Sequence, residues 1–80
     1  MTITVLLFAS YADALGAPTL DLELPRDATV GDLVAAVRER PGAERLPHAP
    51  LVAVNQHYAA MDLVVRDGDE VALIPPVAGG

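Results

Sequence analysis

The sequence predicts an α+β domain in which a mixed sheet of about five strands packs on one main helix. Several short β-branched or apolar segments have the pattern of strands, one of them with a clean alternation of apolar and polar residues, and only one segment has a helical period. One helix can cover only one face of a sheet, so the other face should stay open. The 80 residues suit a single domain, which we expect to span 1–74 and to be followed by a flexible tail over 75–80.

The first strand, over 2–8, is rich in β-branched residues and is apolar on both faces. Its odd-numbered residues should face the helix, which places Leu6 and Phe8 on the opposite side. Ser10 as a cap and Gly16 as a stop then indicate a short turn of helix that serves only as a connector.

The second strand, over 19–24, alternates inward leucines with outward polar residues. Thr29 and Asp32 then resemble a capping box, with Asp in place of Glu, at the start of an amphipathic helix of about 29–40. Pro41-Gly42 ends this helix.

Short apolar runs separated by turn signals predict the rest of the sheet, after a proline-rich loop over 43–50. We expect strands at 51–54, 57–58 and 70–74, with turns at 55–56 and 66–69. By analogy, a first and a last strand that are neighbours in a mixed sheet crossed by one helix form the β-grasp arrangement of ubiquitin-like proteins.

The chain is acidic, with eleven Asp and Glu against five Arg and a formal net charge of -6. This charge disfavours nonspecific binding to nucleic acid or anionic membranes and favours basic protein partners. We expect acidic residues of the helix and loops, including Asp32, Glu39 and Glu44, to form a solvated face that steers such partners. No segment has the pattern of a transmembrane helix or a signal peptide, so we expect a cytoplasmic protein.

The residues that commonly bind metals are poorly placed for it. The absence of cysteine excludes thiolate ligands and cysteine nucleophiles. His48 and His57 lack the spacing of paired ligands, and Asp67, Asp69 and Glu70 suit a turn rather than a calcium loop. We expect no metal site.

The last six residues, Pro75-Pro76-Val77-Ala78-Gly79-Gly80, carry the strongest functional signal. Two prolines stiffen the base of this segment, and two glycines without side chains let its end thread a narrow channel. Six extended residues reach roughly 20 Å. Such a tail can present an activated carboxylate inside another protein, and the alternative is a frayed terminus.

The segment from Asp67 to Gly80 closely resembles the C-terminal signature of the molybdopterin synthase sulfur-carrier family, the small subunits of that synthase. Val54-Asn55-Gln56 and the opening Val5-Leu6-Leu7-Phe8-Ala9 also look like this family at matching distances from the ends. The resemblance is strong at the tail, moderate at the start and absent in detail over 41–50. It implies a ubiquitin-like β-grasp fold, in agreement with the element order.

The resemblance also implies a chemistry centred on Gly80. A ubiquitin-activating-type enzyme would adenylate Gly80 with ATP, a sulfur donor would convert it to a thiocarboxylate, and the large synthase subunit would receive the tail. Sulfur would then pass to cyclic pyranopterin monophosphate for molybdenum cofactor synthesis. The chain would bind no permanent cofactor, supply no catalytic side chain and join a heterotetramer of two small and two large subunits. The residues implied to enter the large subunit are Pro75, Pro76, Val77, Ala78 and Gly79.

A second candidate site lies on the open face of the sheet. Leu6 and Phe8 should be joined there by Ile74 of the last strand and by Tyr58 of the edge strand, and exposed apolar clusters mark partner surfaces. The alternative is that loops cover these residues as ordinary core. In similar carriers, apolar residues at matching positions dock the large subunit.

Other functions stay open from the sequence. The same activation chemistry would serve a sulfur carrier for thiamine or tRNA thiolation, or a ubiquitin-like protein modifier that forms amide links. A protein of another class, a non-catalytic interaction module, would use the apolar face and have an inert tail.

Overall fold

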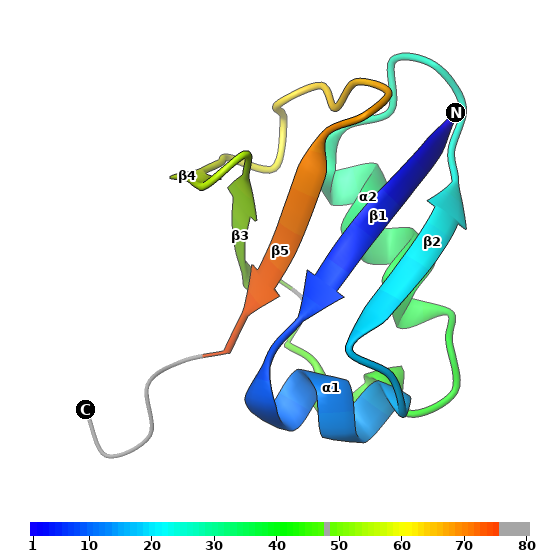
Figure 1. The fold of residues 1–80 in the computed structure, drawn as a ribbon, viewed down its shortest axis with the longest axis vertical. Coiled ribbons are helices and arrows are strands. Elements are labelled where there is room, and N and C mark those ends of the chain that lie inside the picture. The colour runs from blue at the N-terminus through cyan, green and yellow to red at the C-terminus, as the bar shows by residue number, and fades with distance from the viewer. Residues whose placement is uncertain (48, 76–80) are drawn as a thin grey trace.

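The structure, a computed structural model that describes residues 1–47 and 49–75, is a five-stranded sheet with a helix across one face (Figure 1). The strands are β1 (Thr2–Leu7), β2 (Thr19–Glu23), β3 (Leu51–Val54), β4 (His57–Tyr58) and β5 (Glu70–Ile74). The helices are α1 (Ala9–Leu15), α2 (Val30–Arg38) and a 3-10 turn, η1 (Ala43–Arg45). Within the described ranges, no helix is long and apolar enough to cross a membrane.

The strand order is β2-β1-β5-β3-β4. The central pair, β1 and β5, is parallel, whereas the other three pairs are antiparallel. First and last strands are therefore neighbours in a mixed sheet, and α2 crosses one side of it (Figure 1). This arrangement confirms the predicted β-grasp fold.

The core lies between the sheet and α2. Ile3, Val5, Leu33, Val37 and Leu73 are completely buried there. The odd-numbered side of β1 therefore faces the helix, as predicted. Because none of the described helices lies on the opposite side of the sheet, its side chains stay accessible.

The helix α2 begins as its sequence predicts. The hydroxyl of Thr29 accepts a hydrogen bond from the Asp32 amide (3.2 Å), and the Asp32 carboxylate accepts one from the Thr29 amide (2.9 Å). The helix ends at Arg38, whose guanidinium donates to the carbonyl oxygens of Leu46 (2.6 Å) and Pro47 (3.0 Å). These two bonds tie the following loop to the helix, which ends before the expected limit of about 40.

The prediction for the segment after β1 is wrong in two respects. It is a helix of seven residues rather than a connecting turn, and its N-cap is Phe8, with no side-chain cap from Ser10. Tyr11 and Leu15 lie four residues apart on one helix face, so they pack together against the core. This packing orders two turns of helix that the capping signal alone did not indicate. Gly16 ends the helix in a left-handed conformation, as predicted.

The expected loop over 43–50 contains η1, a 3-10 turn that was not predicted. The remaining strands, β3, β4 and β5, have the predicted bounds. His48 and residues 76–80 lie outside the described residues, so of the predicted tail only Pro75 is described.

We predict that Gly42→Ala destabilises the fold far more than Gly16→Ala. Both glycines have positive φ (90° and 78°), which costs an alanine about 1–2 kcal/mol. A Cβ at Gly42 would also lie 2.0 Å from the carbonyl oxygen of Ala14, whereas nothing lies within 4 Å of one at Gly16. Urea denaturation should show that Gly42→Ala lowers the free energy of unfolding by about 3 kcal/mol or more. Equal losses of unfolding free energy in the two variants would show that Gly42 does not lie against the Ala14 carbonyl of α1.

We also predict a specific effect of Tyr11→Phe at high pH. Tyr11 is buried, its hydroxyl has no hydrogen-bond partner among the described residues, and desolvation raises its pKa. The neutral phenol therefore stabilises the fold fully below the unfolded pKa of about 10, and this stability is lost as pH rises through the folded pKa. The unfolding free energy of the native chain should fall more steeply above about pH 10 than that of Tyr11→Phe. The exposed Tyr58→Phe is the control, and a native-like slope in Tyr11→Phe would contradict the assignment.

Candidate functional site

The open face of the sheet, opposite α2, brings the four predicted docking residues together. Leu6, Phe8, Tyr58 and Ile74 line a single shallow hollow there. Its other lining residues are Ala53, Gln56, Glu70 and Ala72. A set of residues scattered from position 6 to position 74 of the chain therefore forms one surface.

The register of the sheet explains the hollow. Leu6 of β1 is paired with Ala72 of β5, Ala72 with Ala53 of β3, and Ala53 with Tyr58 of β4. Paired residues point to the same face, so these four form one row across the sheet. The two alanines make a low floor between the larger Leu6 and Tyr58.

The hollow is accessible to a partner. Tyr58 is 73% exposed and Phe8 is 48% exposed, while Leu6 and Ile74 are partly buried. The described loops therefore do not cover this face as ordinary core. We use the name apolar half for the exposed or partly exposed apolar residues of the open face around this hollow, namely Leu6, Phe8, Leu51, Tyr58, Ala72 and Ile74.

Leu51 is not among the predicted site residues, because the run 51–54 predicts an apolar strand without assigning its faces. Leu51 is paired with Ile74 and is 49% exposed, whereas Val52 and Val54 are buried. The alternation of Leu51 with these two valines is a signal that could have placed it on the open face. It enlarges the apolar surface beside the end of β5.

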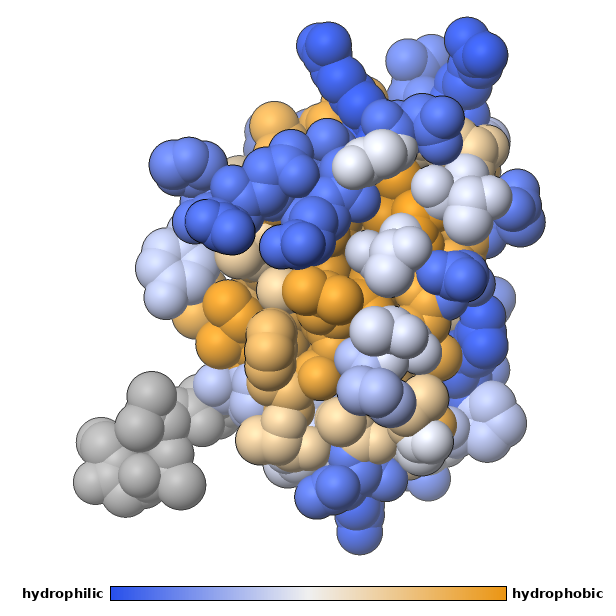
Figure 2. All heavy atoms as spheres, in the orientation of Figure 1, coloured by the Kyte–Doolittle hydropathy of each residue, from blue (hydrophilic) through white to orange (hydrophobic). Residues whose placement is uncertain are grey.

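The other part of the open face is polar. Thr4 donates a hydrogen bond to the Asp21 carboxylate (2.9 Å), and Thr2 donates one to Glu23. Glu70 of β5 is paired with Thr4 and so joins these carboxylates on the same face. In Figure 2, hydrophobic atoms occupy the centre of this face and hydrophilic residues gather at its upper end. The three residues Asp21, Glu23 and Glu70 form what we name the acidic half.

The motif Val54-Asn55-Gln56 has a structural role next to the hollow. Asn55 and Gln56 both have positive φ (51° and 71°) and form the two-residue turn between β3 and β4. The Asn55 side chain accepts from the Glu70 amide (3.0 Å) and donates to Asp69 (3.0 Å). The turn that carries β4, and with it Tyr58, is thereby fixed to the start of β5.

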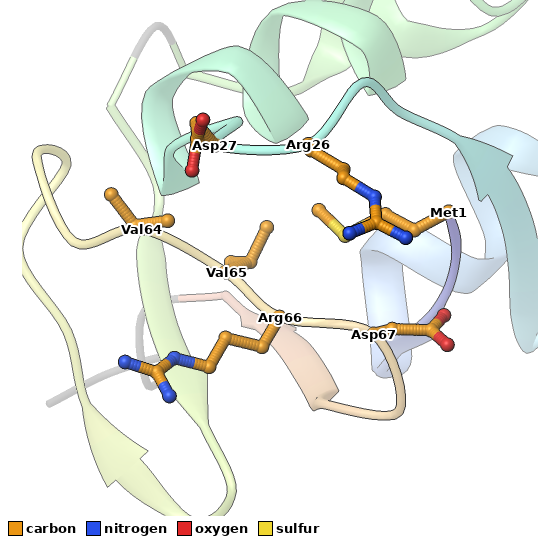
Figure 3. Close-up of a pocket in the computed structure, with 7 residues that line it drawn as sticks. All are labelled: Met1, Arg26, Asp27, Val64, Val65, Arg66 and Asp67. Carbon is orange, nitrogen blue, oxygen red and sulfur yellow. The ribbon is translucent and has the colours of Figure 1, made fainter.

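A second hollow lies at the end of the sheet where β1 begins (Figure 3). The side chain of Arg26 lies beside Met1, and those of Arg66 and Asp67 point in different directions. Its rim carries charges of both signs, and none of the predicted docking residues lines it. The full lining is Met1, Arg26, Asp27, Val64, Val65, Arg66 and Asp67.

In the described part of the chain, no group of three His, Cys, Asp or Glu residues could hold a metal ion. Asp69 serves the turn before β5, because its carboxylate accepts from the Arg66 amide (2.8 Å). His57 is exposed on β4.

The described part of the chain ends, at Pro75, beside the apolar half. Ile74 ends β5, lines the hollow together with Phe8, and is followed by the partly buried Pro75. The predicted reactive residue, Gly80, and the tail residues Pro76, Val77, Ala78 and Gly79 lie outside the described residues. Their roles stay predictions.

Comparison with known proteins identifies the family of this chain. The model of the ThiS family matches residues 5–80. The chain belongs to the ThiS family. It is 35% identical over 79 residues to the molybdopterin synthase sulfur carrier subunit of Arabidopsis thaliana, an alignment that covers 98% of this chain and 82% of the relative.

Solved structures share the fold. The crystal structure of SAMP1 from Haloferax volcanii, a small archaeal modifier protein, has a TM-score of 0.89 at 34% identity, with both chains fully covered. A complex of subunits 1 and 2 of the molybdopterin-converting factor from Helicobacter pylori has a TM-score of 0.74 at 23% identity, again with both chains fully covered. At that identity the second likeness shows the fold alone.

Proposed function

We propose that this protein is the sulfur-carrier subunit of a molybdopterin synthase. Its Gly80 is adenylated, converted to a thiocarboxylate and delivered to the large synthase subunit, where it donates sulfur to cyclic pyranopterin monophosphate. The observation that carries the proposal is the position of the apolar half, which lies where β5 ends and the chain continues into Pro75-Pro76-Val77-Ala78-Gly79-Gly80. Membership of the ThiS family and the likeness to a molybdopterin synthase sulfur carrier subunit support it.

The apolar half lies close to the start of the C-terminal tail, and this arrangement suits delivery of the tail into a docked partner. A partner that covers Phe8, Leu51 and Ile74 has its own surface next to Pro75, so the tail can enter that partner directly. The six residues of the tail reach roughly 20 Å when extended. Docking on the sheet therefore places Gly80 at a site well inside the partner and holds it there at high effective concentration.

The chemistry needs activation because a carboxylate is a poor electrophile. In the activating enzyme, a Gly80 carboxylate oxygen attacks the α-phosphorus of ATP, which forms the acyl adenylate and releases pyrophosphate. A sulfur donor then displaces AMP and leaves a thiocarboxylate. In the synthase, this sulfur bonds to a carbon of the pterin precursor as the oxygen substituent on that carbon leaves. Water then hydrolyses the resulting thioester, which leaves the sulfur on the pterin and restores the Gly80 carboxylate. Two carriers supply the two sulfurs of the dithiolene.

These reaction steps require two protein partners. The carrier must bind an adenylating enzyme first and the large synthase subunit second, and the apolar half is the surface we assign to docking the large subunit. ATP is used by the activating enzyme and is not held by the carrier. A cytoplasmic location suits this use of ATP.

A protein modifier is the second candidate function. The likeness to SAMP1 over the whole chain favours it. The modifier shares the adenylation of Gly80 but passes the acyl group to an amine, which forms an amide and releases AMP. The two functions differ in the nucleophile, sulfur or amine, that the activated carbonyl meets.

The first prediction from this proposal concerns the mass of the chain. After incubation with ATP, a ubiquitin-activating-type enzyme and sulfide, sulfur should replace one oxygen in the C-terminal peptide that ends at Gly80. A chain with Gly80 deleted is the control and should stay unmodified. An unmodified native chain, beside a carrier known to be active in the same tube, would favour the interaction module.

The second prediction concerns Phe8→Asp. Phe8 is exposed and occupies the N-cap of α1, a position where Asp is favoured, so the variant should fold with native stability to within about 1 kcal/mol. Its affinity for the large subunit should fall at least tenfold, as expected for loss of an aromatic anchor worth about 2 kcal/mol or more. Leu63→Asp is the matched control, because Leu63 is 44% exposed but does not line the hollow. Equal affinities for the two variants in a calorimetric titration would refute docking through the apolar half.

A further inference from the structure

We propose that the acidic half of the open face binds a cluster of arginine or lysine side chains on the large synthase subunit and so fixes the orientation in which the apolar half docks. This inference rests on the proposed function and deepens it, because it specifies the chemistry of the partner surface. The three residues concerned are Asp21, Glu23 and Glu70.

The acidic half and the apolar half belong to one continuous face, on which no described helix packs. Glu70 lines the hollow together with Leu6 and Ile74. Asp21 and Glu70 lie on either side of Thr4, on the strands that flank β1. At two strand spacings these positions are about 10 Å apart, so one basic cluster can face both. A protein that covers the hollow must therefore approach these carboxylates.

Hydrogen bonds from neutral groups hold two of these carboxylates along the surface of the described domain. The hydroxyl hydrogen bonds from Thr2 and Thr4 orient Glu23 and Asp21 without adding positive charge. Arg40 contacts Asp21 only at its main-chain carbonyl oxygen (3.4 Å). None of the five described strands contains an arginine. The charge of this face is thus complementary to a basic partner.

The two halves would make different contributions to binding. Burial of apolar surface is favourable but non-directional, so the hollow alone does not specify which way a partner lies across it. Complementary charges fix the register of an interface and increase its association rate more than its affinity. The acidic half lies toward the starts of β1 and β5, and Pro75 follows the opposite end of β5. A correctly oriented partner therefore has the channel that receives the tail next to Pro75.

This assignment differs from the sequence-based expectation that Asp32, Glu39 and Glu44 steer basic partners. Asp32 is used in the capping box of α2. Glu39 and Glu44 follow in the helical layer, in the C-cap of α2 and in η1, away from the open face. An experiment can distinguish steering by the acidic half from steering by the acidic residues of the helical layer.

The test compares two triple variants of the full chain with the same change in net charge. The first is Asp21→Asn, Glu23→Gln and Glu70→Gln, whose amide oxygens can still accept the hydrogen bonds from the threonines. The second is Asp62→Asn, Glu39→Gln and Glu44→Gln, all exposed and all on the helix side or in the loop after β4. Association with the large subunit is followed by stopped flow over a series of salt concentrations, and melting curves confirm that both variants fold.

We expect the first variant to associate about tenfold more slowly than the native chain at low salt, with a weaker dependence on salt. The second variant should stay close to the native rate. Equal rates in the two variants would overturn the inference, because net charge rather than the acidic half would then govern association. If the native chain and the Leu63→Asp control both fail to bind the large subunit, the proposed function itself is contradicted.

Discussion

The parallel pairing of β1 with β5 is the contact on which the rest of the structure depends. It joins the first and last strands of the chain at the centre of the sheet, with β2 on one side and β3 on the other. Because the two strands run in the same direction, the chain leaves β5 at the end of the sheet where β1 passes into α1. Phe8 and Ile74 therefore meet at the point where the tail begins.

One helical layer on a sheet has a direct functional consequence. The side of the sheet that faces α2 buries Ile3, Val5 and Leu73 and supplies the core, while the opposite side stays open. Apolar residues on that open side add little to the stability of the isolated chain but supply area that a partner can bury. The same division gives the open face an apolar half near the tail and an acidic half near the starts of β1 and β5.

Much of the fold and of the candidate site could be predicted from the sequence, and the features that could not be predicted have physical causes. The period-two strands and the capping box of α2 are local signals, so their positions were predictable. The length of α1 could not be predicted, because Tyr11 is ordered by burial against residues distant in the chain rather than by a cap. The grouping of Leu6, Tyr58 and Ile74 required an analogy for the strand order, and the acidic half depends on the register of three strands.

The central claim is that this chain carries sulfur on Gly80 into a partner docked on its open face. Its most direct test mixes the isolated thiocarboxylated chain with the large synthase subunit and cyclic pyranopterin monophosphate, and follows both the carrier mass and the dithiolene product. We expect Gly80 to return to a carboxylate as product forms, with two carriers consumed for each product. A thiocarboxylate that persists beside an active large subunit, or sulfur lost without product, would contradict it.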